Sequence, residues 1–255
     1  MRPAASATDS LPTEVLMAHR GYPARYPENS LAGMRAALEA GALMVEFDVQ
    51  LTADGVPVVI HDEGLERTAG SEGSVLDLLA AALPGIDVSE AARFGDRHRQ
   101  TPLPTLDEML ALIDEYPRVV AFVELKRASM RRFGRRALVD AVMQRVGRHR
   151  RRVVISYDAE MVAMARAAGA LRIGWVTGSF DAANERSARE LQPEFVFCSA
   201  EIVPAEGRPF WTGSWQWVVY DVNDPVLARD LLARGADLIE TDRIVDFLGQ
   251  GDDDH

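Results

Sequence analysis

Short apolar, β-branched runs alternate with stretches of helical periodicity along almost the whole chain, and this alternation limits the possible folds more than any other feature of the sequence. The runs that fit parallel strands are residues 15–19, 44–49, 119–126, 153–157, 171–176, 195–199, 217–222 and 238–241. The stretches that fit helices are residues 30–40, 106–115, 133–146, 159–168, 184–191, 225–234 and 244–248. Eight strands with intervening helices in a chain of 255 residues predict a single α/β domain, the closed TIM (β/α)8 barrel.

The rival architecture is an open, doubly wound sheet, which carries a glycine-rich phosphate-binding fingerprint after its first strand. No such fingerprint follows residues 15–19, so the sequence favours the barrel. We therefore expect a barrel domain over residues 15–248, an N-terminal extension over residues 1–14 and a disordered tail over residues 249–255.

One further apolar run, residues 56–61, does not fit the parallel count. Only six residues separate it from the strand before it, which is too few for a parallel crossover, and the last two are Asp54-Gly55, a strong hairpin signal. The run is therefore predicted to form an antiparallel hairpin with that strand. The hairpin belongs to an insertion over about residues 50–104, which we expect to cap the barrel mouth and to contain a short apolar helix near residues 75–83.

The length of the hairpin turn decides which side chain lies opposite His61. A two-residue turn places Asp48 opposite His61, and a four-residue turn places Glu46 there. A three-residue turn would place Phe47 opposite His61 instead. We expect one of the first two registers, with an acid and the histidine side by side on one face.

Charged residues end or follow several of the apolar strands, where a barrel of this kind carries its chemistry. These residues are His19, Arg20, Glu46, Asp48, His61, Glu124 and Lys126. Period-two alternation aims Glu46 and Asp48 the same way, and it gives Glu124 and Lys126 a common face. Three carboxylates converging at one end would repel one another without a cation. We therefore expect one hard divalent ion, Mg²⁺ or Ca²⁺, on oxygen ligands.

The charge balance and the cysteine count exclude several classes of protein. The formal net charge of −11 argues against a nucleic-acid partner, because phosphate attracts the opposite sign. The longest stretch without charged residues, 209–220, is too short to span a membrane, and the N-terminus lacks the apolar segment of a signal peptide. The single cysteine, Cys198, cannot form an intramolecular disulfide and is expected to be buried and inert, which fits a cytoplasmic protein. Lys126 is the only lysine among 28 basic residues, which is either chance or the mark of a site that needs a compact point charge.

Short motifs follow one another in a specific order along the chain. They are HRG at 19–21, PENS at 27–30, EFDV at 46–49, TADG at 52–55, VVIHD at 58–62, LERT at 65–68, PLPTL at 102–106, VELK at 123–126 and IETD at 239–242. This ordered set closely resembles the glycerophosphodiester phosphodiesterases of the phospholipase C-like superfamily. The resemblance covers most of residues 15–242 and is densest before Lys126.

The resemblance implies a TIM barrel that hydrolyses small-molecule glycerophosphodiesters to sn-glycerol 3-phosphate and an alcohol. It also implies three groups of site residues: metal ligands Glu46, Asp48 and Glu124, a catalytic pair His19 and His61, and phosphate-binding Arg20 and Lys126. Tyr220 stands where the family usually has a tryptophan, and we expect it to form an aromatic wall of the substrate site.

The chemistry of phosphodiester cleavage agrees with this set, because it needs neutralised phosphate oxygens, an activated attacking oxygen and a protonated leaving oxygen. We assign His19 as the base and His61 as the acid, with the reverse assignment left open. The attack comes from water, or from the glycerol 2-hydroxyl through a cyclic phosphate. One rival is a phospholipase D- or C-like enzyme that uses the same site on lysophospholipids. Another is a barrel that binds a phosphate compound without turnover, against which the intact residue set argues.

Four residues near these motifs have interpretations of their own. Asp221 and Glu240 add negative charge where the family pattern lacks it, which favours a cationic alcohol such as choline or ethanolamine. Asn29 is interpreted as a helix cap rather than a ligand, and Asp62 as a partner that orients His61 or as a loop residue.

The segment 127–152 contains ten arginines and one acid. We interpret it as a solvated outer helix, and the alternative is a docking patch for anionic lipid or an acidic protein.

Overall fold

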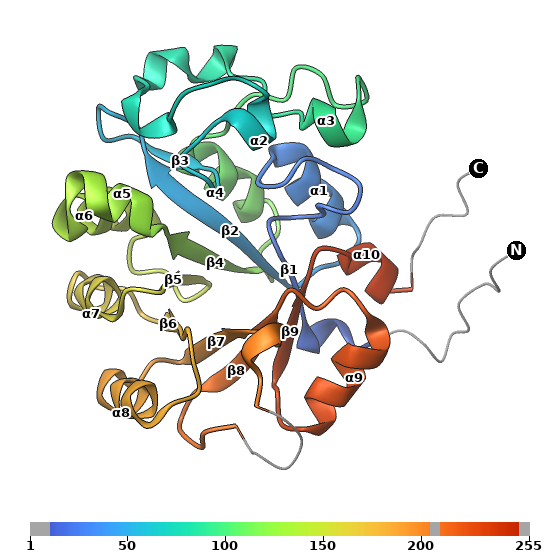
Figure 1. Cartoon of the computed structure of the whole chain (residues 1–255), viewed down its shortest axis with the longest axis vertical. Helices are drawn as coiled ribbons and strands as arrows, with labels where there is room; N and C mark the ends of the chain where they lie inside the picture. Colours follow the sequence, from blue (N-terminus) through green and yellow to red (C-terminus); the bar gives the residue numbers. More distant parts are fainter. Residues whose placement is uncertain (1–10, 205–209, 250–255) are drawn as a thin grey trace, which may run out of the picture.

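Eight parallel strands close into a barrel in the computed structural model, which describes residues 11–204 and 210–249 (Figure 1). The strands are β1 (Leu16–Ala18), β2 (Met44–Leu51), β4 (Val120–Leu125), β5 (Arg152–Ser156), β6 (Ile173–Val176), β7 (Phe195–Ser199), β8 (Gln216–Tyr220) and β9 (Leu238–Thr241). Their order around the barrel is β1-β9-β8-β7-β6-β5-β4-β2, and the pairing of β1 with β2 closes the ring. The predicted TIM barrel is therefore confirmed.

A ring of helices covers the outside of the barrel (Figure 1). The longer ones are α1 (Leu31–Glu39), α4 (Leu106–Asp114), α5 (Arg127–Phe133), α6 (Arg135–Val146), α7 (Ala159–Ala167), α8 (Ala182–Leu191) and α9 (Pro225–Ala233), and the short α10 (Ile244–Phe247) follows β9. The single helix predicted over residues 133–146 is wrong at its start. Gly134, with a φ of 86°, ends α5 and begins α6, because this extended left-handed geometry interrupts the helical hydrogen bonds and suits glycine.

The alternation of side chains along the strands separates two apolar layers. Inward residues such as Met17, Phe122 and Phe197 fill the barrel interior. Outward residues such as Phe47 and Val123 pack between the strands and the surrounding helices. On the first strands, the inward positions are apolar in the lower part of the barrel and charged near the carboxyl ends. Apolar side chains therefore fill the lower barrel, and polar groups line its mouth.

The hairpin forms, but its register differs from the expected one. Strand β3 (Pro57–Val59) pairs antiparallel with β2 in the register Val49↔Val59, and the backbone N–H of Thr52 donates to Val56 O at 3.0 Å. This is a three-residue turn, so the ladder extrapolates to Phe47 opposite His61, and the expected pairing of His61 with an acid is wrong.

The register is set by a hydrogen-bonded turn that contains one residue more than the two-residue turn Asp54-Gly55. The Thr52 hydroxyl donates to Asp54 Oδ1 at 2.6 Å and accepts from the Val56 N–H, so the turn spans residues 53–55. Since β3 ends at Val59, the direction of the His61 side chain is set by the loop after the strand rather than by the ladder.

The insertion has a small apolar core of its own. Val58 and Ile60 point away from the barrel and pack with Leu65, Val75 and Leu103. The apolar helix predicted near residues 75–83 is replaced by two 3-10 helices, η2 (Val75–Asp77) and η3 (Ala80–Gly85). Two short helices, α2 (Glu66–Ala69) and α3 (Ala91–Phe94), complete the insertion, which lies beside β3 and α1 in Figure 1.

Residues 11–15 lie against the barrel: the Leu11 N–H donates to Phe247 O at 3.2 Å, and η1 (Thr13–Val15) leads into β1. Most of the predicted N-terminal extension (1–10) and of the predicted tail (250–255) lies outside the described residues. Within the described ranges, each helix is too short or too polar to cross a membrane.

Half of the ten arginines in 127–152 form ion pairs with acids on the outer surface. The pairs are Arg132–Asp77, Arg135–Asp158, Arg136–Asp140, Arg145–Asp107 and Arg152–Asp114. These pairs favour the interpretation of this segment as a solvated helical face. Cys198 is fully buried, and burial raises the pKa of its thiol, which fits an inert cysteine.

Candidate active site

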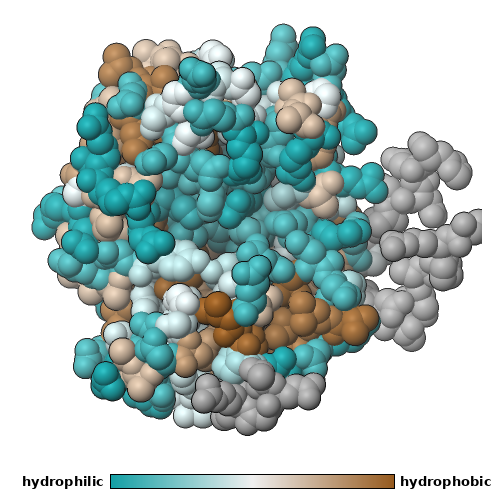
Figure 2. All heavy atoms as spheres, viewed as in Figure 1, coloured by the Kyte–Doolittle hydropathy of each residue, from teal (hydrophilic) through white to brown (hydrophobic). Residues whose placement is uncertain are grey.

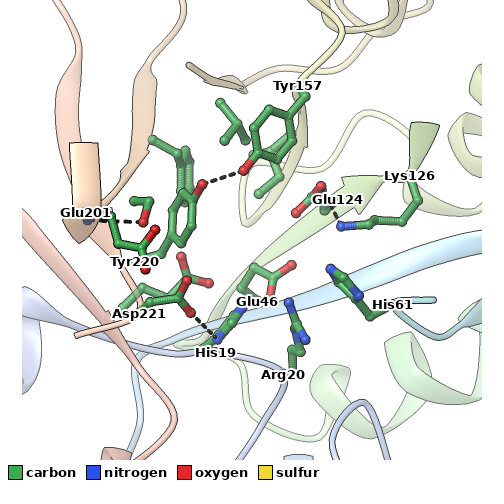
Figure 3. A pocket seen from close by; sticks show the side chains of 15 residues that line it. His19, Arg20, Glu46, His61, Glu124, Lys126, Tyr157, Glu201, Tyr220 and Asp221 are labelled. Atoms are coloured by element: carbon green, nitrogen blue, oxygen red, sulfur yellow. Dashed lines mark hydrogen bonds and ion pairs between the residues drawn. The ribbon is translucent and has the colours of Figure 1, made fainter. Parts of the chain in front are cut away.

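A cavity of about 400 Å³ opens at the carboxyl ends of the strands, and every barrel strand or the loop after it contributes a residue to its wall. Hydrophilic residues gather at the centre of the face shown in Figure 2. Figure 3 shows that His19, Arg20, Glu46, His61, Glu124 and Lys126 lie around one side of the cavity. The structure thus brings six of the predicted site residues to one cavity wall, and Tyr220 lies across from them. Asp48 lies next to these residues, in contact with Arg20 and Lys126.

Three carboxylates converge on the β2–β4 side of the cavity. Asp48 pairs in register with Glu124, and Glu46 lies one inward position below Asp48 on β2. Ligand oxygens of these three residues lie within 4.8 Å of one another. Glu46 is 2% exposed, and neither of its carboxylate oxygens has a hydrogen-bond partner in the described structure. Burial and the neighbouring charge of Asp48 raise the pKa of Glu46 well above its ordinary value.

Two basic side chains partly neutralise these acids. Lys126 Nζ lies 3.1 Å from Asp48 Oδ1 and 3.0 Å from Glu124 Oε1, and Arg20 Nε lies 3.0 Å from Asp48 Oδ2. Burial alone would raise the pKa of Asp48, but Lys126 and Arg20 outweigh it, so this pKa lies below its ordinary value. Asp48 is therefore held as an ionised carboxylate, while Glu46 lacks a comparable partner.

Asn29 also holds Asp48 in place, and its interpretation as a helix cap is wrong. The Asn29 side-chain amide donates to Asp48 Oδ2 at 2.8 Å, and the Asp48 N–H donates to Asn29 Oδ1 at 3.1 Å. The cap of α1 is Ser30, whose hydroxyl accepts from the Gly33 N–H. Asn29 has a φ of 55°, which directs its side chain back onto β2 rather than onto the helix. Two adjacent cap-forming residues made the sequence signal ambiguous.

His19 is held by a carboxylate at the end of the last strand. Its Nδ1 lies 2.8 Å from Asp242 Oδ1, and the Asn223 side chain donates to the other oxygen of Asp242 at 2.9 Å. With Nδ1 engaged, Nε2 is the ring nitrogen that remains for a ligand. Burial lowers the pKa of His19, but the carboxylates of Glu240 and Asp242 outweigh it and raise that pKa above its ordinary value.

His61 is held in the same manner by the residue that follows it. Its Nδ1 lies 2.6 Å from Asp62 Oδ1, and Asp62 Oδ2 accepts from Arg67 Nε at 2.6 Å. Gln50, a buried side chain on β2, donates to the backbone carbonyl of His61 at 3.0 Å. These contacts, rather than the hairpin ladder, bring His61 to the cavity, and they bear out Asp62 as a partner of His61.

A chain of ion pairs connects the two sides of the site. Arg67 makes a two-pronged contact with Glu28, with both N···O distances at 2.7 Å, and Glu28 also accepts from Arg20 at 3.2 Å. Since Arg20 contacts Asp48, the chain runs from a candidate metal ligand to the partner of His61. Asp242 and Arg67 were not identified as site residues from the sequence, although Asp242 follows a strand end, which is a usable signal.

The opposite side of the cavity differs in character. Ile155, Val176 and Phe197 form its apolar floor. The hydroxyls of Tyr157 and Tyr220 are hydrogen-bonded to each other above that floor, as Figure 3 shows. The expected aromatic wall is therefore formed by two tyrosines rather than one. Three acidic residues, Glu201, Asp221 and Glu240, also line this side.

The residues present fit a hard divalent cation. Glu46, Asp48 and Glu124 offer only oxygen ligands, and the two partnerless, buried oxygens of Glu46 are the groups that a cation would satisfy. A second group of possible ligands, His19, Glu46 and Glu240, shares Glu46 but includes a nitrogen donor, which suits Mg²⁺ and Ca²⁺ less well.

Comparison with known proteins identifies a family that matches most of the chain. The model of the "Glycerophosphoryl diester phosphodiesterase family" matches residues 19–245 of this chain. A glycerophosphodiester phosphodiesterase of Caldanaerobacter subterraneus is 41% identical over 101 residues, which are 40% of this chain and 41% of that protein. One from Bacillus altitudinis is 38% identical over 116 residues, 46% of each chain. The matched segments thus span less than half the length of these two curated relatives.

Solved structures resemble the whole barrel. A phosphodiesterase of Oleispira antarctica, solved in complex with the product sn-glycerol-3-phosphate, has a TM-score of 0.78 at 23% identity and aligns over 92% of this chain and 95% of that one. A putative glycerophosphoryl diester phosphodiesterase of Silicibacter pomeroyi has a TM-score of 0.77 at 25% identity over 94% and 96% of the two chains.

Proposed function

The chain belongs to the glycerophosphoryl diester phosphodiesterase family, and we propose that it is a metal-dependent hydrolase that converts glycerophosphodiesters to sn-glycerol 3-phosphate and an alcohol. The observation that carries the proposal is the set of three converging carboxylates, one of them buried without a hydrogen-bond partner, beside two histidines whose Nδ1 atoms are held by acids. The Oleispira relative, which holds sn-glycerol-3-phosphate as its product, supports the same class of substrate.

In this proposal Glu46, Asp48 and Glu124 hold one Mg²⁺ or Ca²⁺ ion. When bound, the ion neutralises charge on the phosphate oxygens and so favours attack at phosphorus. Lys126 and Arg20 border the same cavity and bind the phosphate from the side. Both already contact Asp48, so they are fixed in position before the substrate arrives.

The two histidines move the protons. His19 Nε2 takes the proton from the attacking oxygen, as the new P–O bond forms, and Asp242 stabilises the resulting imidazolium through Nδ1. The bond from phosphorus to the alcohol oxygen breaks, and His61 Nε2 gives that oxygen a proton while Asp62 holds Nδ1. The attacking oxygen belongs to water or to the glycerol 2-hydroxyl. The roles of the histidines are reversed if the substrate binds in the opposite direction.

Release of sn-glycerol 3-phosphate from glycerophosphocholine tests the proposal. We expect turnover that stops with EDTA and returns when Mg²⁺ or Ca²⁺ is added. His19→Ala and His61→Ala should each lower kcat about 100-fold or more. An exposed exchange on α8, Glu190→Gln, serves as the matched control. Activity that survives chelation would refute metal dependence, and near-normal rates in either alanine variant would refute the catalytic pair.

A further inference from the structure

The cavity has two halves of opposite charge character. Its basic residues, Arg20 and Lys126, both lie on the β1–β4 side with the candidate metal ligands. The β7–β9 side contributes three carboxylates, Glu201, Asp221 and Glu240, and no lysine or arginine among the described residues lines that half. In a chain with 28 basic residues, this half of the cavity remains negative.

Glu240 is the strongest indication that the acidic half receives a ligand. It is 2% exposed, lies at an inward position of β9 and borders the cavity. Within the described ranges, no hydrogen bond or ion pair reaches its carboxylate, although His19 is close enough to interact with it electrostatically. Its carboxylate borders the open cavity, and one of its oxygens lies within 4.8 Å of ligand atoms of His19 and Glu46, so a cationic group that enters the cavity can reach Glu240.

Asp221 and Glu201 stand above Glu240 at the rim. The Asp221 side chain is 54% exposed, and its nearest charged partner is His19 Nδ1 at 3.8 Å. Glu201 follows β7, and its backbone N–H is fixed by the Ser199 hydroxyl, while the side chain points toward the cavity in Figure 3. Neither carboxylate has an arginine or lysine partner in the part of the chain that the structure describes. Both are therefore available to a ligand.

The aromatic wall lies next to these acids. Tyr220 is hydrogen-bonded through its hydroxyl to Tyr157, which fixes the position of both rings. Arg127 already lies over the Tyr157 ring, with its guanidinium carbon 4.9 Å from the ring centroid. Tyr220 is thus the ring that remains for an incoming cation. An aromatic face beside carboxylates is the usual environment for an ammonium or quaternary ammonium group.

We propose that the β7–β9 side of the cavity, formed by Glu201, Asp221, Glu240 and Tyr220, binds the positively charged head group of the leaving alcohol. This inference rests on the proposed function, because the phosphate must lie at Lys126 and Arg20 for the alcohol to reach the opposite side. The substrates of choice are then glycerophosphodiesters of amino alcohols, either the quaternary choline ester or the primary-ammonium ethanolamine ester.

A pair of substrates that differ only in charge tests the inference. Glycerophosphocholine is compared with the glycerophosphate ester of 3,3-dimethylbutanol, in which a carbon atom replaces the quaternary nitrogen. We expect the wild-type kcat/KM to favour the choline ester about tenfold or more. Glu201→Gln and Asp221→Asn should each reduce this ratio about 3-fold, and the double variant, which keeps Glu240 and Tyr220, should reduce it further than either single variant.

Two controls make the outcome specific. Glu190→Gln removes one negative charge from the outer surface and should leave the ratio unchanged. Since Asp221 lies near His19, its variant is judged by the ratio between substrates, which a general loss of catalysis does not alter. Hydrolysis of both esters with equal kcat/KM in the wild type would overturn the cationic subsite and leave the proposed function intact. Hydrolysis of neither would overturn the proposed function and this inference with it.

Discussion

Replacing the Glu46 carboxylate by an amide should separate the stability of the metal-free protein from its response to metal. Burial and Asp48 raise the pKa of Glu46, so its folded pKa lies above the unfolded value of 4.5. At neutral pH the unfolded state is therefore ionised more readily, and keeping Glu46 charged destabilises the fold. Glu46→Gln removes this penalty with little change of shape. Without metal, the variant should be at least as stable as the wild type at pH 7, and any advantage should disappear below about pH 4.

In the presence of metal, the effect of Glu46→Gln on stability should be reversed. An ion that binds only the folded state at 100 times its Kd stabilises that state by about 2.7 kcal/mol. For a domain of this size that corresponds to a rise in Tm of about 5–11 °C. The wild type offers the ion three carboxylates, whereas Glu46→Gln leaves two and a weaker amide oxygen. We expect the variant to lose most of the rise at equal metal concentration.

Thermal unfolding in EDTA and during titration with Mg²⁺ or Ca²⁺ measures both effects. Glu190→Gln, which changes the same charge on the exposed face of α8, controls for net charge. A full metal-induced rise in Glu46→Gln would show that Glu46 is not a ligand. A variant markedly less stable than the wild type in EDTA would show that Glu46 has a stabilising partner.

Three further predictions concern single side chains. Lys126→Arg keeps the charge but cannot place a compact ammonium between two carboxylates. We therefore expect kcat to fall about 10–100-fold. An unchanged kcat would mean that the lysine is dispensable. Arg67→Met removes the contact that holds Asp62 against His61. We expect kcat to fall about tenfold on alkyl esters and less on a p-nitrophenyl ester, whose leaving group needs no proton. Equal losses of kcat on both substrates would contradict this positioning role. Asp158→Ala removes the cap of α7 and a contact to Arg135, so the free energy of unfolding at pH 7 should fall by about 1 kcal/mol in denaturant titrations. Burial raises the pKa of Asp158, but the hydrogen bond from Arg135 outweighs it and lowers that pKa below its ordinary value. The difference in stability between wild type and variant should therefore shrink only as the pH falls below 3.8, and an undiminished difference in strong acid would exclude the ionic contribution.

The barrel and the convergence of charges could be predicted because both depend on local periodicity. Side chains two residues apart on a strand share a face, so Met44, Glu46 and Asp48 all point inward. The parallel register of β2 and β4 then places Asp48 beside Glu124. The polar ends of the early strands therefore meet whatever the details of the loops. This part of the site needs only the alternation of the strands and the closure of the barrel.

The features that could not be predicted depend on single turns and on contacts between distant segments. One extra residue in the turn before Val56 moved the register so that Phe47, not an acid, is level with His61. The left-handed φ of Asn29 turned an apparent helix cap into a support for Asp48. Both outcomes are decided by small differences among backbone conformations, which composition and periodicity do not resolve.

The pairs Asp242–His19 and Arg67–Glu28 join residues 223 and 39 positions apart. Such pairs are set by how finished elements pack together. Local sequence patterns indicate that strand ends carry the site residues, but they do not predict which acid contacts which histidine.

The separate core of the insertion makes the two histidines dependent on different parts of the molecule. His19 is attached to the barrel, whereas His61, Asp62 and Arg67 lie on the insertion, whose apolar cluster includes Val75 and Leu103 and is separate from the two clusters of the barrel. Local opening of this small unit would withdraw one histidine and leave the three carboxylates of the barrel in place. As denaturant increases, the enzyme should then lose turnover before it loses its affinity for the cation.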